Sequence, residues 1–281
     1  MNLTRSASGR LARFVLAALV AGSAAPAAAG IGDWASGAKA RVRLIVSGIG
    51  EDGRLAVGIE IRLPPGWKTY WRTPGDGGIA PTFDLSGSRN LAAPTVRFPV
   101  PDRYDDGYSV SNVYTDRVIF PVSAEVPDAS KSVFIVLGVD LGVCAVICVP
   151  DRVDVRLIVN PGEQDRVAAR LLASAVAALP GPAEPGVLAV DDVARAGGPD
   201  KRPVFHFAVT TDDPANAIVF VEGPDDWSSG TPVLVAETTN GADYAVKFSR
   251  LVAVTPVDAA EFRVTIVSGD RAVEQTIGLD D

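Results

Sequence analysis

The feature that most constrains the fold is a succession of short β-branched runs separated by Gly, Pro, Asp and Asn. Between about Ala38 and Val159 apolar and polar side chains alternate, or nearly alternate, within these runs. The runs are Arg41–Val46, Leu55–Leu63, Arg117–Val122, Val133–Leu137 and Val153–Val159. Alternation with a period of two is typical of strands that bury one face. The pattern predicts an antiparallel β-sandwich, with the Gly- and Pro-rich residues 73–88 as a long loop.

A helical segment follows, and then a second β region. Asn160 as N-cap, Pro161 at the first position and Glu163 two residues later predict a helix over 161–179. Further strand-like runs are found at 204–209, 217–221, 244–248, 262–267 and 273–277. The chain is therefore predicted to be all-β, with two sandwiches joined by one helix. The predicted units are a first sandwich over 38–160, a linker helix over 161–182 and a second sandwich over 186–281.

The N-terminal 29 residues have the pattern of a targeting segment. Arg5, Arg10 and Arg13 precede the apolar stretch Phe14–Val20, and small residues at 27–29 fit a cleavage site. We predict that residues 1–29 are a signal peptide and that the protein is exported to the periplasm. A retained membrane anchor is the weaker alternative. No other segment is long and apolar enough to span a membrane, so the cleaved chain is expected not to span one.

Charge and residue usage exclude several classes of partner and chemistry. Without the three leader arginines the chain has 23 basic and 34 acidic residues, a net charge of −11, and no basic cluster. Nucleic acid and anionic membrane surfaces are therefore poor partners. His206 is the only histidine and Met1 the only methionine, which rules out a site with several His ligands. No cofactor and no metal are predicted.

Two cysteines, Cys144 and Cys148, are the candidate catalytic residues. In an exported chain such a pair is expected to be oxidised or to cycle between redox states. A disulfide needs Cα atoms about 4.4–6.8 Å apart, whereas positions four apart in a straight strand are separated by roughly 13 Å. The chain must therefore turn between them, as a tight hairpin or one helical turn. So short a ring stabilises a fold only weakly, by roughly 2 kcal/mol. This small gain suits a redox-active disulfide better than one that serves to stabilise the fold.

The neighbours of the pair suggest how it reacts. Val143, Val146 and Ile147 are apolar, and burial among them raises the pKa of a thiol and makes it a poor nucleophile. Arg152 is the nearest base in the sequence. We infer that the oxidised pair is attacked by a thiolate of a partner and does not start the exchange itself. An inert structural disulfide remains the alternative from these arguments alone.

Several motifs resemble the N-terminal periplasmic domain of the DsbD/ScsB family of thiol:disulfide interchange proteins. The matching segments are Pro65–Arg72, Pro74–Asp76, Pro81–Ser88, Phe98–Tyr104, Tyr114 and the stretch from Cys144 through Cys148 to Pro150. The resemblance is close over about residues 40–160. The second β region suits the ScsB-like branch more loosely.

The resemblance implies an immunoglobulin-like fold in which Cys144 and Cys148 cycle between dithiol and disulfide. It implies electron transfer from a membrane-embedded thiol reductase to periplasmic thioredoxin-like proteins, and a link to cytochrome c biogenesis. Cys148 would form the mixed disulfide with partners. Family members shield the pair with an aromatic-bearing loop, for which residues 104–114 are the candidate. These 281 residues hold neither a membrane domain nor a thioredoxin-like one, so the reductant is expected to be a separate protein.

Other conspicuous side chains are expected to be structural. Trp67, Thr69 and Trp71 alternate with Lys68, Tyr70 and Arg72 on the two faces of a strand. Large aromatics are mostly core residues, although one face could screen the disulfide. Asp76, Asp105 and Asp106 are expected to be solvated loop acids, and His206 an ordinary strand residue.

Two other functions remain open from the sequence. Two thiolates could hold copper(I), which favours soft ligands, as in a copper-tolerance protein. Alternatively, the sandwiches could form a non-catalytic binding module with a structural disulfide.

Overall fold

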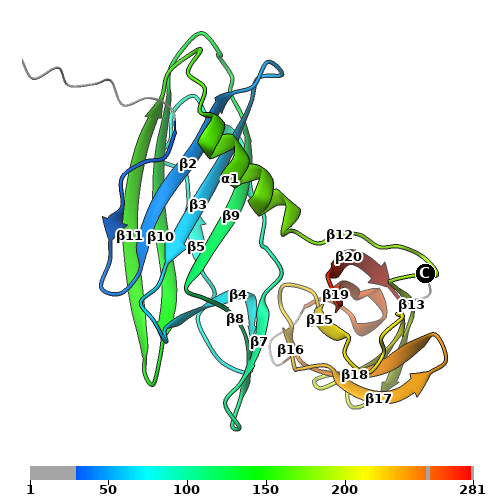
Figure 1. Cartoon of the computed structure of the whole chain (residues 1–281). Helices are drawn as coiled ribbons and strands as arrows, with labels where there is room; N and C mark the ends of the chain where they lie inside the picture. The colour runs from blue at the N-terminus through cyan, green and yellow to red at the C-terminus, as the bar shows by residue number, and fades with distance from the viewer. Residues whose placement is uncertain (1–29, 251–253, 280–281) are drawn as a thin grey trace, which may run out of the picture.

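The computed structural model describes residues 30–250 and 254–279, which form two β-sandwiches joined by a helix (Figure 1). The predicted all-β, immunoglobulin-like architecture is confirmed. The predicted signal peptide, residues 1–29, lies outside the described residues.

The first sandwich consists of two antiparallel sheets. One sheet has the order β1 (Ala35–Ser36), β2 (Arg41–Ile49), β3 (Arg54–Arg62), β9 (Arg117–Glu125) and β6 (Ala92–Val96). The other has the order β11 (Cys148–Val159), β10 (Val133–Cys144), β4 (Lys68–Gly75), β8 (Val110–Thr115) and β7 (Asp102–Asp105), and β5 (Thr82–Asp84) pairs with β10. Their inner faces share one apolar core that includes Leu44, Ile59, Trp71, Phe120 and Leu137.

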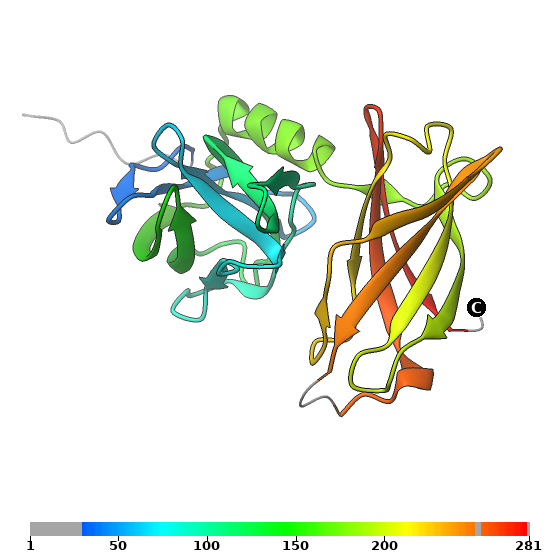
Figure 2. The ribbon, with the colours of Figure 1, turned by 90° about the horizontal axis from the view of Figure 1, so that it is seen from below.

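Helix α1 (Arg166–Ala177) covers the outer face of β2, β3 and β9, as Figures 1 and 2 show. Ala168 and Leu172 pack there against Ile45. This cover explains why the middle of β3 is buried on both faces, although alternation would leave one face in water.

The helix begins later than predicted. Asn160 does donate two hydrogen bonds to the Glu163 carboxylate, at 3.0 and 2.9 Å, but they close a turn outside the helix. Gln164 then bridges to Gly48, and the Asp165 backbone N–H donates to the Ser47 carbonyl at 2.9 Å. These contacts hold the chain extended along β2, so Asp165 is the N-cap, where it accepts hydrogen bonds from the backbone of residues 167 and 168.

The second sandwich also has two sheets. One has the order β12 (Gly181–Pro182), β20 (Arg271–Gly278), β19 (Glu261–Ser268) and β15 (Ile218–Glu222). The other has the order β13 (Ala189–Gly197), β14 (Val204–Thr210), β18 (Gly241–Ser249) and β16 (Ser228–Ser229), and β17 (Val233–Thr238) also pairs with β18. A short 3-10 helix, Val257–Ala259, precedes β19. Phe205, Phe207, Phe248 and Phe262 fill the core between these sheets.

The predicted loop over residues 73–88 is partly strand. β4 continues to Gly75, and β5 pairs with β10 through Phe83 opposite Val139. A three-residue strand is too short to show a period in the sequence, and its pairing with β10 depends on the packing of Phe83 against the core.

Candidate functional site

Cys144 and Cys148 close the hairpin between β10 and β11, which turns at the lower end of the first sandwich in Figure 1. The two strands pair without a break from Val133 opposite Val159 to Cys144 opposite Cys148. Residues 145–147 make the turn, and Ala145 N–H donates to the Ile147 carbonyl at 3.1 Å. The cysteines form a disulfide with Cα atoms 4.0 Å apart. The predicted sharp bend is therefore present, and of the two possible forms it is the tight hairpin.

The two sulfurs lie in different environments. Cys144 is 2% exposed and packs in a buried cluster with Tyr70 and Val113. Cys148 is exposed, and the turn beside it presents Val146 at 99% and Ile147 at 68% exposure. Burial therefore applies to Cys144, which Tyr70 and Val113 cover, and not to Cys148, because the hairpin tip projects beyond the core.

Tyr70 is the polar side chain in contact with the disulfide. Its hydroxyl donates to Cys144 Sγ at 2.9 Å and lies 3.5 Å from Cys148 Sγ. Strand β4 positions it, because Lys68 pairs with Cys144 and Thr69 Oγ1 donates to the Gly142 carbonyl at 2.9 Å. Burial raises the pKa of Tyr70 above its usual 10.0, and the nearby Asp106 carboxylate raises it further. The hydroxyl is therefore a protonated hydrogen-bond donor at any physiological pH.

A glycine lets the loop after β4 lie against this tyrosine. Gly78 has a φ of +135°, and a Cβ at this position would stand 2.3 Å from the Tyr70 ring. The neighbouring Ile79 contacts Gly142 on β10, where a Cβ would come within 2.8 Å of it. Both contacts need a missing side chain, so the loop can lie this close to the Tyr70 ring and to β10 only because glycines stand at these places.

The charged side chain nearest to the cysteines in the sequence, Arg152, is not the one that strand pairing places opposite Cys144. Arg152 pairs with Asp140 at 2.6 Å and with Asp154 at 3.2 Å, so its charge is engaged along the strand. Lys68, far away in sequence, stands opposite Cys144, and its Nζ lies 3.9 Å from the centre of the Tyr104 ring.

The stretch 104–114 borders the site through β7 and β8. Val113 packs on Tyr70 and Cys144, and Tyr104 lies under Lys68. Tyr108 at the hairpin tip is fully exposed, whereas Tyr114 is buried and donates to the Pro99 carbonyl at 2.6 Å. Among the described residues the hydroxyl bonded to the sulfurs thus comes from β4 and not from this candidate loop.

The remaining residues singled out in the sequence have structural surroundings. Trp71 is fully buried in the first core. Asp76 and Asp106 are exposed and accept backbone hydrogen bonds that brace the loops around residues 106–110. His206 is an exposed residue of β14 in the second sandwich. In the part of the chain that the structure describes, no three His, Cys, Asp or Glu side chains gather as a metal site.

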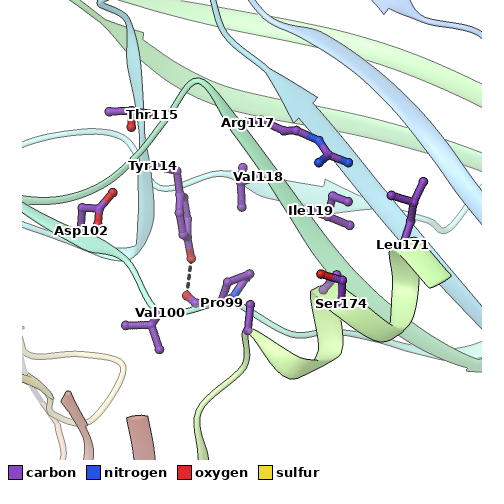
Figure 3. A pocket seen from close by; sticks show the side chains of 12 residues that line it. Pro99, Val100, Asp102, Tyr114, Thr115, Arg117, Val118, Ile119, Leu171 and Ser174 are labelled. Atoms are coloured by element: carbon purple, nitrogen blue, oxygen red, sulfur yellow. Dashed lines mark hydrogen bonds between the residues drawn. The ribbon is translucent and has the colours of Figure 1, made fainter. Parts of the chain in front are cut away.

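A separate cavity of about 310 Å³ lies between α1, β8 and β9 (Figure 3). Its lining includes the apolar Val118, Ile119 and Leu171 beside the charged Asp102 and Arg117. It contains neither cysteine nor Tyr70, so it is not part of the disulfide site.

The chain is similar to known proteins in sequence and in fold. Residues 40–160 match the family described as "Thiol:disulfide interchange protein DsbD, N-terminal". The N-terminal periplasmic domain of ScsB from Proteus mirabilis has a similar fold, with a TM-score of 0.66 and 21% identity over 90% of this chain and 99% of that one. No curated protein sequence matches the chain significantly. The resemblance expected from the motifs is confirmed. Within residues 30–250 and 254–279, no helix has the length and apolar character needed to cross a membrane.

Proposed function

We propose that this chain is a periplasmic thiol:disulfide exchange module that works through Cys144 and Cys148, because residues 40–160 match the DsbD N-terminal family. Residues 38–160 would be the redox unit, 161–182 the connection and 186–281 a second unit. One observation carries the proposal: Cys148 is open to solvent, while the hydroxyl of Tyr70 is directed at the buried Cys144.

This asymmetry assigns the two sulfurs different roles. A thiolate of a reducing partner attacks the exposed Cys148 sulfur, a mixed disulfide forms, and the bond to Cys144 breaks. Cys144 leaves as a thiolate and receives the hydrogen bond of Tyr70, which lies closer to it than to Cys148. Hydrogen bonds to charged acceptors are stronger than those to neutral ones, so the hydroxyl stabilises the leaving group.

The second half of the exchange releases the partner. A second thiol of the reducing partner attacks the partner's own sulfur in the mixed disulfide and frees Cys148 as a thiolate. Two electrons have then moved, the partner is a disulfide, and Cys144 and Cys148 are a dithiol. Delivery runs the same steps in reverse: Cys148 attacks the disulfide of an oxidised acceptor, and Cys144 resolves the intermediate.

The surface around Cys148 suits a protein partner. Val146 and Ile147 are exposed beside it, and Tyr104, which lies under Lys68 of β4, is partly exposed on β7. Apolar side chains in such a position can be covered by a docked protein. The proposed donor is a separate membrane-embedded thiol reductase, and the proposed acceptors are periplasmic thioredoxin-like proteins, to which the N-terminal leader would bring this chain by export.

A single-cysteine trap tests this assignment. Cys144→Ala keeps the exposed Cys148 and removes the resolving thiol, so it should form a lasting mixed disulfide with oxidised thioredoxin. Cys148→Ala is the matched control, because its remaining thiol is buried, and it should trap little or nothing. Both species are counted on non-reducing gels. If Cys144→Ala traps nothing, or if both variants trap equally, the assignment is wrong.

The other functions open from the sequence make different predictions for the same protein. A permanent brace would have a reduction potential below about −300 mV. A copper protein would use the two thiolates that the structure shows joined to each other, and the reduced chain would bind copper(I) at micromolar levels. A higher potential together with partner trapping supports the exchange module over both.

A further inference from the structure

The second sandwich contacts the strand that carries Tyr70. β15 is the last strand of its sheet, and its residues Val219 and Glu222 are hydrogen-bonded to side chains on β7 and β4 of the first sandwich. Arg103 on β7 donates to the Val219 carbonyl of β15 at 2.6 Å. Edge carbonyls need such partners, so this contact ties the two sandwiches together.

Phe220 anchors the contact. It is 1% exposed, and although it belongs to β15 it packs within the core of the first sandwich. Its ring centre lies 5.4 Å from that of Trp71 and 4.8 Å from the guanidinium of Arg103. A large aromatic side chain that one sandwich inserts into the core of the other is expected to hold the two together.

Arg72, two residues after Tyr70, completes the contact. Its guanidinium is hydrogen-bonded to both carboxylate oxygens of Glu222 and also pairs with Glu274. Thr73 adds a bond to Glu222 at 2.7 Å. Burial by itself would lower the pKa of Arg72, but the bonds to Glu222 and Glu274 outweigh it and raise the pKa, so the guanidinium remains charged. We call Arg72, Glu222 and Glu274 the Arg72 clamp.

We propose that the Arg72 clamp is a positioning device for the redox site, through which the second sandwich fixes β4 and keeps the Tyr70 hydroxyl on Cys144. The inference rests on the role proposed above for Tyr70. The sequence Tyr70-Trp71-Arg72 places the sulfur contact, the Phe220 contact and the clamp on consecutive residues of one strand. A displacement of about 1 Å can greatly weaken a catalytic contact. If the clamp no longer holds β4 at Arg72, the hydrogen bond from Tyr70 to Cys144 should weaken, because Tyr70 is only two residues away.

The test is a double-mutant cycle in the full chain. Glu222→Gln with Glu274→Gln keeps the shape of the clamp and removes its charges from the second sandwich. The rate of disulfide reduction by dithiothreitol is measured for this pair, for Tyr70→Phe and for the combination. We expect the Gln pair to slow reduction by about two- to fivefold relative to the wild type. Added to Tyr70→Phe, the same pair should slow reduction by less than about 1.5-fold relative to Tyr70→Phe alone, because the effects of sites that act through one contact are not additive.

The matched control is Asp212→Asn, which breaks the Arg271 ion pair in the same sandwich without touching β4. It should leave the rate unchanged. Arg72→Lys, which keeps a charge in the clamp, should lie between the wild type and Arg72→Met. Near-UV circular dichroism checks folding, and if the Gln pair does not fold, Glu274→Gln alone carries the same test.

The outcomes separate this inference from the proposed function. If Tyr70→Phe slows reduction and the Gln pair does not, or if the two effects simply multiply, the positioning role is wrong and the role of Tyr70 stands. If Tyr70→Phe itself has no effect, the role of Tyr70 fails and the clamp proposal fails with it.

Discussion

Removing a single oxygen atom tests the chemistry proposed for this site. Tyr70→Phe deletes the hydroxyl that donates to Cys144 Sγ at 2.9 Å and keeps the ring that packs on Val113 and Cys144. The disulfide should still form, because the hairpin of β10 and β11 brings the sulfurs together independently of Tyr70. What the variant loses is stabilisation of negative charge on Cys144 as the bond breaks.

The magnitude follows from the change in the acceptor. A hydrogen bond to a neutral acceptor contributes about 1 kcal/mol, and one to a charged acceptor about 1.5–3 kcal/mol. The difference, about 0.5–2 kcal/mol, corresponds to a reduction rate that is ~2- to 30-fold slower.

Stopped-flow reduction by dithiothreitol, followed at several pH values, measures the effect. Because the pKa of Tyr70 is raised above 10.0, its hydroxyl keeps its proton, and the ratio of wild-type to variant rates should stay constant between about pH 6 and 9. Tyr244→Phe is the control, since it removes a hydroxyl bonded to the Ala217 carbonyl in the second sandwich. Equal rates for wild type and Tyr70→Phe, or an equal loss in both variants, would refute the reasoning.

Three further changes test other parts of the structure. Gly78→Ala places a Cβ against the Tyr70 ring and should slow reduction at least as much as Tyr70→Phe, while a normal rate would show that the loop yields easily. Ile147→Asp should leave reduction by dithiothreitol within about twofold but weaken exchange with thioredoxin about tenfold, since the exposed apolar tip is the proposed docking surface. Glu60→Gln should lower the free energy of unfolding at pH 7 by about 1–3 kcal/mol. Burial would raise the pKa of Glu60, yet hydrogen bonds from Arg43 and Arg117 hold it below 4.5. The ionised carboxylate therefore stabilises the fold above pH 4.5. In urea titrations, the difference in free energy of unfolding between wild type and variant should disappear as the pH falls below 4.5.

Much of the fold could be predicted from local patterns. The runs at 41–46, 133–137 and 262–267 all lie within observed strands, because the period of two is a property of each strand alone. The helix was placed correctly, but its start at Asn160 was wrong. Whether Asn160 or Asp165 is the N-cap depends on the hydrogen bonds of residues 164 and 165 to β2. The residues around the cap do not reveal these bonds, because β2 is distant in the sequence.

The candidate site was predicted in part. The cysteines and their sharp turn followed from a spacing of four and the length of a disulfide. Tyr70 was assigned to the strand face opposite Trp71, but its contact with the sulfurs was missed. Alternation separates the two faces of a strand, and it does not say which face meets a hairpin that lies 74 residues further along the chain.

The sequence by itself determined the strands, the bend between Cys144 and Cys148 and the family resemblance of residues 40–160, because each depends on residues close together in the chain. Only the tertiary structure decided that Cys148 is open and Cys144 covered, and that β4 joins the disulfide to the second sandwich through Arg72 and Glu222. Burial and long-range hydrogen bonds arise when distant strands meet, and their partners cannot be identified from residue spacing alone.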